Sequence, residues 1–388
     1  MMERVSKNNC SGCAVCAMVC PQNCITMLPD EMGFLYPKID RDRCVQCGLC
    51  QDRCPACSKA ARAEATYSVE AYAVVGNDEK IREKSSSGGA FYLIARYVLS
   101  RDGVVFGAAF DDTCHSVKHI DVGSLDGLKR LQGSKYVQSE IGESYLLARS
   151  YLEQGRLVLF TGTPCQIAGL KTFLNKEYSN LYLMDIVCHG VPSPDVWDAY
   201  LTHLEKQYGG KTKRVAFRDK TNGWENYLLR VEMDNGAVYS NDRINDLYMR
   251  GFLHNCFLRS SCYECMHKGT ERGADITLGD FWGIGKICPE LQDGKGTSLV
   301  IASSPKGKFL LAQISAEVRI QKVALDDLIS FNPAIVQAAS YNPIRETFEK
   351  EFRQKPIMVV LKKYCSMSKF KKLKRAIKSI MKCNQRMK

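Results

Sequence analysis

Eight cysteines near the start of the sequence stand in two copies of one pattern. Each copy reads C-x2-C-x2-C-x3-C and is followed by proline, a spacing that predicts two [4Fe–4S] clusters. Three thiolates two residues apart can surround three corners of a cubane, and the fourth reaches across to the other cluster. We therefore expect one cluster on Cys10, Cys13, Cys16 and Cys54, and the other on Cys44, Cys47, Cys50 and Cys20.

Zinc sites and disulfides are the competing interpretations of these cysteines. Structural zinc sites take four ligands in two close pairs, whereas these runs end in Cys-Pro. Disulfides belong to oxidising compartments, and residues 1–9 are polar, without the apolar segment of an export signal. The iron–sulfur interpretation is favoured, with residues 25–28 and 34–39 as the hairpin of a ferredoxin-like module.

Two further cysteines follow neighbouring strands of buried type. Cys165 comes after residues 156–160. Thr163 and Pro164 would begin a helix there, and its dipole favours thiolate over thiol at Cys165. Cys188 ends the next expected strand, at the edge where open α/β sheets build their sites. A C-x2-C pair brings the number of thiols to four, as a further cubane requires: Cys262 and Cys265.

A serine- and glycine-rich loop precedes an expected helix at residues 91–99. Residues 84–90 read KSSSGGA, and free backbone N–H groups at a helix start suit a phosphate. A serine N-cap with a flexible approach is the competing interpretation, and the loop lacks the G-x-G-x-x-G of a Rossmann fold. Lys135 lies in a second small and basic segment, where it would either neutralise a cofactor phosphate or remain a solvated charge.

Several motifs in order resemble the coenzyme F420 hydrogenase/dehydrogenase beta-subunit family, in its bacterial branch with a fused ferredoxin module. They are SSSGGA (85–90), TGTPCQ (161–166), CHG (188–190), FRDK (217–220) with Trp224, and SCYEC (261–265) followed by ITLGDFWG (276–283). The resemblance implies FAD beside a third [4Fe–4S] cluster, because a flavin joins one-electron to two-electron chemistry. It implies that the cluster ligands are Cys165, Cys188, Cys262 and Cys265, and that the flavin pocket includes Ser87, Gly88, Gly89 and Lys135.

The catalytic residues are less constrained by the resemblance. His189 would protonate a reduced flavin or substrate, or would donate a hydrogen bond to cluster sulfur or cap a loop. Asp280 is the second catalytic candidate, with loop bracing as its alternative role. Arg218 and Trp224 would shape the substrate side. Cys256 departs from the expected motif and ranks as the spare thiol.

The chain must supply elements that position these residues, and its 388 residues with 45% hydrophobic content allow two or three domains. We expect a mixed α/β (α+β) protein. Residues 1–62 would form the ferredoxin-like module, residues 68–340 a larger flavin-binding α/β domain, and residues 341–388 a basic helical tail. The main expected strands are 69–75, 103–110, 117–122, 181–187 and 297–303, and the main helices 124–131, 141–154, 195–208 and 305–314.

The net charge of +12 is concentrated at one end of the sequence. Residues 352–388 carry 13 lysines and arginines and no acidic residue, so the rest carries −1. Five apolar residues recur at helical spacing among the lysines: Met367, Phe370, Leu373, Ile377 and Ile380. An anionic membrane surface, an acidic partner protein and a solvated tail remain open as explanations. A nucleic-acid partner is disfavoured, because no readout fold accompanies the charge.

These patterns predict a cytoplasmic iron–sulfur flavoprotein oxidoreductase, without a run of apolar residues long enough to span a membrane. Electrons would pass between the ferredoxin-type clusters, the third cluster and FAD, and to or from a small molecule. A glycan precursor, as the bacterial branch suggests, and coenzyme F420 are the two substrates considered. The alternative is a non-catalytic electron-transfer subunit that docks on a partner enzyme.

Overall fold

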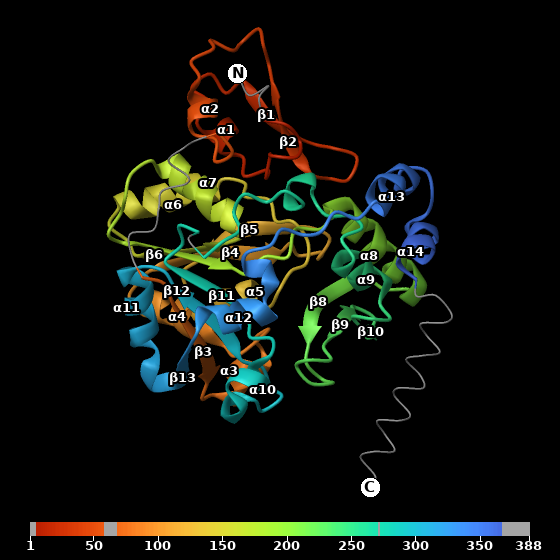
Figure 1. Ribbon diagram of the computed structural model, residues 1–388. Helices are drawn as coiled ribbons and strands as arrows, with labels where there is room; N and C mark the ends of the chain where they lie inside the picture. Colours follow the sequence, from red (N-terminus) through yellow and green to blue (C-terminus); the bar gives the residue numbers. More distant parts are fainter. Residues whose placement is uncertain (1–4, 58–67, 271, 367–388) are drawn as a thin grey trace.

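A mixed β-sheet forms the centre of the computed structural model, which describes residues 5–57, 68–270 and 272–366 (Figure 1). In this part of the chain the sheet has eight strands in the order β13-β3-β12-β11-β7-β6-β4-β5. The segment β4-β6-β7-β11 is parallel, and the other pairs are antiparallel. The strands are β3 (Glu70–Gly76), β4 (Val104–Phe110), β5 (Val117–Val122), β6 (Val158–Gly162), β7 (Leu181–Ile186), β11 (Ile276–Asp280), β12 (Ser298–Ala302) and β13 (Val318–Val323).

Helices cover both faces of this sheet, because its central strands carry apolar side chains on both sides. Val105 and Leu159 pack on the face covered by α4 (Ala90–Leu99), α5 (Leu125–Leu131) and α11 (Pro305–Gln313). Phe106 and Phe160 point the other way and stack with ring centroids 5.3 Å apart. That second face is covered by α6 (Ser144–Glu153) and α7 (Pro164–Leu174), and further along by α10 (Ile284–Ile287) and α12 (Leu325–Phe331). The mixed α/β expectation is confirmed.

A second, antiparallel sheet lies beside the first and carries its own helices (Figure 1). Its strands are β8 (Thr212–Asp219), β9 (Leu228–Met233) and β10 (Val238–Asp242). The helices around it are α8 (Pro194–Tyr208), α9 (Leu247–Leu253), α13 (Ile344–Phe352) and α14 (Ile357–Cys365). Phe348, Val360 and Leu361 are fully buried in the same apolar cluster as Trp197. The structure therefore differs from the expected tail boundary at residue 341, because residues 344–365 belong to the core.

The ferredoxin-like module, residues 5–57, lies against the main domain at one end of the molecule (Figure 1). It contains α1 (Val15–Met18), the expected hairpin as β1 (Ile25–Pro29) and β2 (Leu35–Ile39), and α2 (Leu49–Asp52). The hairpin tip enters the main domain, since Met32 and Phe34 are 1% and 0% exposed beside Trp197. Ser193 at the start of α8 donates a hydrogen bond of 2.6 Å to the Met32 carbonyl. Apolar burial thus docks the module.

The remaining short helix is α3 (Glu79–Glu83), which precedes the serine- and glycine-rich loop. Strands and helices expected around the cysteine motifs are confirmed, including α7 with Thr163 as its N-cap and Pro164 in its first turn. Within the described residues, no helix is long and apolar enough to cross a membrane. The expected amphipathic helix, with its apolar residues at 367–380, lies outside the described residues.

Candidate functional site

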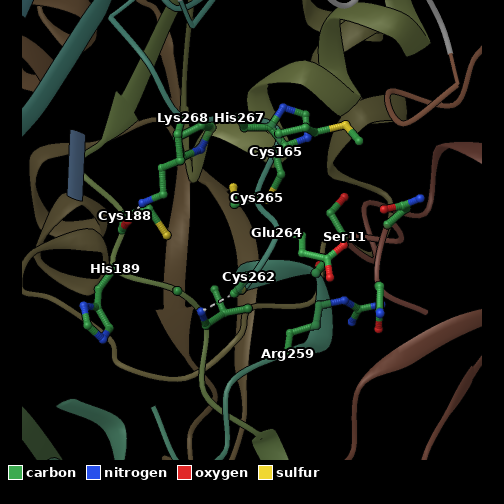
Figure 2. A pocket seen from close by; sticks show the side chains of 17 residues that line it. Ser11, Cys165, Cys188, His189, Arg259, Cys262, Glu264, Cys265, His267 and Lys268 are labelled. Carbon is green, nitrogen blue, oxygen red and sulfur yellow. Dashed lines mark hydrogen bonds between the residues drawn. The ribbon is translucent and has the colours of Figure 1, made fainter. Parts of the chain in front are cut away.

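Four cysteines from three distant parts of the chain line one pocket, the main thiol pocket (Figure 2). One stands in the first turn of α7 and one follows β7; the other two lie at and after η3 (Ser260–Cys262). The sheet brings the first two together, because β6 and β7 are parallel neighbours. The pocket thus unites the four thiols that the resemblance assigned to a third cluster: Cys165, Cys188, Cys262 and Cys265.

The surroundings of these thiols suit a cubane. The Val191 N–H donates to Cys262 Sγ over 3.4 Å, and Thr163 Oγ1 lies 3.1 Å from Cys165 Sγ. At Gly190, with φ of 143°, a Cβ would lie 3.6 Å from Cys262 Sγ and 2.8 Å from Leu258 Cδ1. Across the described residues, no three Cys, His, Asp or Glu side chains converge as they would around one metal ion. Four thiols that line one pocket are the type and number of donors that a [4Fe–4S] cluster takes.

Burial dominates the electrostatics of the main thiol pocket. It raises the pKa of Cys165, Cys188 and Cys262, the last to about 12. The expected helix-dipole effect at Cys165 is therefore outweighed by desolvation. Thiols in such a place become thiolates when a metal supplies the compensating charge. Lys268 adds positive charge beside Cys188, since its ammonium donates to the Cys188 carbonyl and, over 2.8 Å, to that of Ala334.

A second thiol pocket lies directly beside the first. It is lined by the four cysteines that spacing assigned to one ferredoxin-type cluster: Cys10, Cys13, Cys16 and Cys54. Asn9, Ser11 and His267 line both pockets, so these residues stand between the two sets of thiols.

The other predicted ferredoxin-type set lies in the outer part of the module. Cys20, Cys44 and Cys50 pack around the buried Cys24, whose sulfur is 3.3 Å from that of Cys20. Cys47 is exposed, beside an apolar Val45 that is 61% exposed. Ligation of each set remains a prediction.

The serine- and glycine-rich loop lies next to the Lys135 segment, and flavin binding at these residues stays a prediction. Ser86 Oγ lies 2.9 Å from Ser134 Oγ and accepts a 2.9 Å hydrogen bond from the Ser134 N–H. Ser87 and Gly88 are held against β12: Ser87 Oγ donates to Thr297 O, and the Gly88 N–H donates to Ser298 Oγ. Gly88 is thus explained by close packing, because a Cβ there would lie 2.4 Å from Val74 O. Gly89 caps α4 with a φ of 95°.

Lys135 is a half-buried cation with carbonyl partners. Its ammonium donates to the Arg130 and Gln132 carbonyls, both over 2.9 Å, and desolvation lowers its pKa to about 7. Among the described residues no carboxylate forms a salt bridge with it. A phosphate at this place would keep the ammonium charged, so Lys135 fits an anionic group of a cofactor.

The two predicted catalytic residues lie in different places. His189 lines the main thiol pocket, where its Nε2 lies 2.6 Å from Asn255 Oδ1 and burial lowers its pKa (Figure 2). Asp280 instead pairs with the buried Arg218, which also donates to the Ser86 carbonyl. Cys256 is buried in an apolar cluster and does not line the main thiol pocket, consistent with its rank as the spare thiol.

The loop-holding roles of Lys220 and Arg259 were not predicted from the sequence, although Lys220 stands in the FRDK motif. Lys220 donates to the carbonyls of Arg82, Ser87 and Lys295, and so fixes the serine- and glycine-rich loop. Arg259 performs a similar role next to Cys262. Lysine and arginine are mostly exposed in proteins, so their type alone gives no signal of such a role.

Asp185 on β7 gives a pH-dependent prediction. Its side chain is fully buried, and burial raises its pKa to about 7, although the Arg272 charge and the Thr277 hydroxyl oppose the shift. Between about pH 4 and 7 the unfolded chain has released a proton that the folded chain keeps, so stability falls as pH rises. We expect Asp185→Asn to be the more stable protein at pH 8, by on the order of 3 kcal/mol.

Urea unfolding of both proteins at pH 5 and pH 8 measures this effect. The gain from Asp185→Asn is larger at pH 8, whereas Asp112→Asn, at a fully exposed side chain, gives no comparable gain. An equal difference at the two pH values would mean that Asp185 is ionised in the folded protein throughout.

Comparisons with known proteins match two families to parts of this chain. The family described as the C terminus of the coenzyme F420 hydrogenase/dehydrogenase beta subunit matches residues 155–327, and the 4Fe-4S dicluster domain matches residues 9–58. The coenzyme F420-dependent sulfite reductase of Methanocaldococcus jannaschii is 26% identical over 324 residues, which cover 79% of this chain and 46% of that protein. The chain therefore spans about half the length of that relative.

Two shorter or weaker similarities accompany these. A polyferredoxin-like protein of Methanocaldococcus jannaschii is 40% identical over 61 residues, which cover 14% of this chain and 36% of that protein. A chain of the F420-reducing [NiFe] hydrogenase complex from Methanosarcina barkeri aligns at 17% identity and a TM-score of 0.47, over 72% of this chain and 91% of that chain. The chain is therefore similar to the coenzyme F420 hydrogenase/dehydrogenase beta-subunit family over residues 155–327, and to the 4Fe-4S dicluster domain over residues 9–58.

Proposed function

We propose that this protein is an iron–sulfur flavoprotein oxidoreductase that moves electrons along a line of three [4Fe–4S] clusters and FAD, to or from a small-molecule substrate. The observation that carries the proposal is the position of the two thiol pockets, which share Asn9, Ser11 and His267 as lining residues. Clusters held there would be near neighbours, and short separations favour electron transfer. The match to a dicluster domain supports the ferredoxin-type part of this line.

The exposed cysteine loop of the ferredoxin-like module would be the outer end of this electron-transfer path. Cys47 and Val45 are accessible to a redox partner protein, whereas Cys16 and Cys54 are buried. Electrons would enter or leave through the outer cluster, continue to the cluster on the second thiol pocket and then reach the main thiol pocket. This order of the clusters follows from the exposure of their cysteines. It does not assign the direction in which electrons flow.

The flavin is proposed for the region around the serine- and glycine-rich loop. The loop contacts Ser134 and adjoins Lys135, a half-buried ammonium without a carboxylate in its salt-bridge range among described residues. Bound there, FAD would convert single electrons into hydride chemistry. The residues of this chain would bind its phosphates through Lys135 and would hold the loop through Arg218 and Lys220.

Coenzyme F420 is the substrate that the comparisons favour. The matched family and the Methanocaldococcus jannaschii relative both carry F420 in their descriptions. A glycan or other small molecule is the second candidate, and a docking subunit without turnover of its own is the alternative function.

Anaerobic turnover without a partner protein tests the proposal. Protein purified anaerobically and reduced with dithionite is expected to be reoxidised when F420 is added, with matching loss of the F420 absorbance. Lys135→Gln should keep its iron, bind FAD more weakly and lose this transfer, because the half-buried cation is missing. Lys129→Gln, at an exposed lysine nearby, is the matched control. Full cluster reduction with no transfer to F420 or any other small molecule tried would favour the docking subunit.

A further inference from the structure

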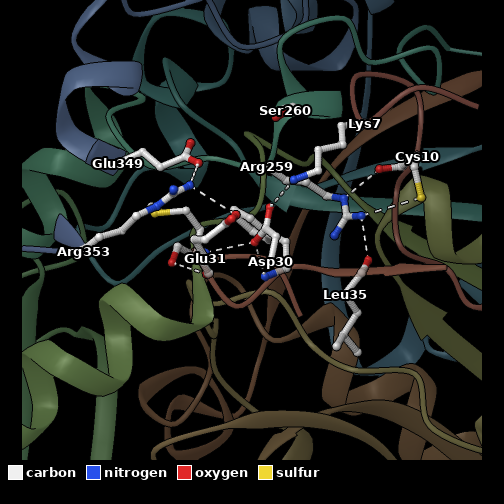
Figure 3. Close-up of polar contacts among 12 residues, drawn as sticks. Lys7, Cys10, Asp30, Glu31, Leu35, Arg259, Ser260, Glu349 and Arg353 are labelled. Atoms are coloured by element: carbon white, nitrogen blue, oxygen red, sulfur yellow. Dashed lines mark hydrogen bonds and ion pairs between the residues drawn. The ribbon is translucent and has the colours of Figure 1, made fainter. Parts of the chain in front are cut away.

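Arg259 is a fully buried arginine that joins the main domain to the ferredoxin-like module (Figure 3). It stands three residues before Cys262, and its backbone carbonyl accepts the Cys262 N–H over 2.9 Å. Its side chain crosses to the module, where Nε donates to the Cys10 carbonyl over 2.7 Å and Nη2 donates to the Leu35 carbonyl over 2.9 Å. One residue therefore contacts loops that carry thiols of both pockets.

The guanidinium lies in a slot built for it. Its Cζ is 5.5 Å from the ring centroid of Phe34 and 4.2 Å from that of Tyr36. Gly12 forms another wall with a φ of 72°, and a Cβ there would lie 2.7 Å from Nη1. Gln138 Oε1 accepts from Nη1 over 3.1 Å. The slot therefore holds the guanidinium group of Arg259 in one side-chain rotamer.

The charge of Arg259 has no carboxylate partner among the described residues. Its remaining contact is with a thiol, since Nη2 lies 3.7 Å from Cys10 Sγ. A buried cation without a counter-ion is costly. A cluster bound through four thiolates supplies negative charge at this place, and hydrogen bonds to its sulfurs are among the factors that set a cluster's reduction potential.

We propose that Arg259 is a positioning residue that sets the reduction potential of the cluster on Cys10 and holds that cluster at a fixed separation from the main thiol pocket. The inference rests on the proposed electron-transfer function. In the transfer, the cluster on Cys10 loses one electron and the cluster on Cys262 gains it, or the reverse, and no proton or bond changes at Arg259. The N–H donor stabilises the more negative, reduced cluster more strongly, so it raises the potential.

Redox titration followed by EPR on the full chain tests this. Arg259→Met keeps an apolar stem between the two rings and removes every N–H donor. We expect the cluster on Cys10 to show the largest shift to lower potential in this variant, with a smaller shift at the main thiol pocket, which Arg259 also lines, and none at the outer cluster. Arg259→Lys should show a smaller shift in the same direction. Electron transfer from the module to the main thiol pocket should slow in Arg259→Met.

Arg345→Met is the matched control, because it deletes a nearby, mostly buried arginine. Arg345 donates to Leu258 O and Ser260 Oγ, which lie in the main domain. The hydrogen bonds to Cys10 come from Arg259, so they remain when Arg345 is replaced. An equal shift in this control, or unchanged potentials in an iron-replete Arg259→Met, overturns the inference.

If Arg259→Met loses one cluster, Arg259→Lys becomes the test of the inference. An unshifted reduction potential in Arg259→Lys then overturns it. The proposed function fails on a different result, namely a wild-type chain without three reducible clusters. The two failures are therefore distinguishable.

Discussion

Replacing Cys165 and Cys262 together by alanine is expected to lower the iron content from about twelve to about eight atoms per chain. The physical reason is that both thiols line the main thiol pocket, and a cubane left with two protein thiolates is not retained. The measurement is iron and acid-labile sulfide on protein purified anaerobically. The EPR signal of one cluster should disappear, while the two signals of the ferredoxin-like module remain.

A matched double variant controls for the loss of two buried cysteines. Cys114 and Cys288 are 6% and 1% exposed and do not line the main thiol pocket. Their replacement by alanine should leave about twelve iron atoms in place. Eight iron atoms in both the wild type and the Cys165/Cys262 variant would contradict the prediction, and the main domain would then be thiol-based or flavin-only.

Phe34→Ala is expected to lower the free energy of unfolding by about 3–5 kcal/mol. Phe34 is fully buried, although it belongs to a hairpin of the ferredoxin-like module, and it packs in the apolar cluster that contains Trp197. Its removal leaves a cavity where the module enters the main domain. Anaerobic urea unfolding of the cluster-loaded protein measures the change.

Leu28 provides the control on the same hairpin. It is 42% exposed, so Leu28→Ala should cost less than about 1 kcal/mol. If the two variants lost similar stability, the hairpin tip would not be part of the main core, and the module would be attached by its linker and polar contacts alone.

Most of the structure that could be predicted from the sequence depends on residues that are close together along the chain. The first turn of α7 followed from Thr163 and Pro164, because N-capping depends on adjacent residues. The strands that deliver Cys165 and Cys188 followed from short apolar runs between turns. The meeting of Cys165 and Cys188 required only that these strands be neighbours in one sheet. Cys262 and Cys265 come from η3 and the loop after it, which the strand order does not position.

Long-range contacts could not be predicted in this way. The lysines around α14 make this part of the sequence look like a solvated tail. Val360 and Leu361 are nevertheless buried, because they pack with α8 and α9, which lie more than a hundred residues earlier. Arg259 looked like an ordinary charge before a C-x2-C pair, because its partners Cys10 and Leu35 are more than two hundred residues away. The roles of such residues appear only when the chain is folded.

The hairpin tip and α14 together constrain the order of folding. Met32 and Val360 belong to the same apolar cluster, so this core closes only after almost the whole described chain has been synthesised. Contacts of such sequence separation make folding slow, because a long loop must close before any burial rewards it. During that interval the cysteine loops of residues 10–54 are not yet packed against the main domain. Late closure of the core therefore leaves the Cys10 loop undocked until late in folding, whereas Cys47 is exposed even in the folded protein.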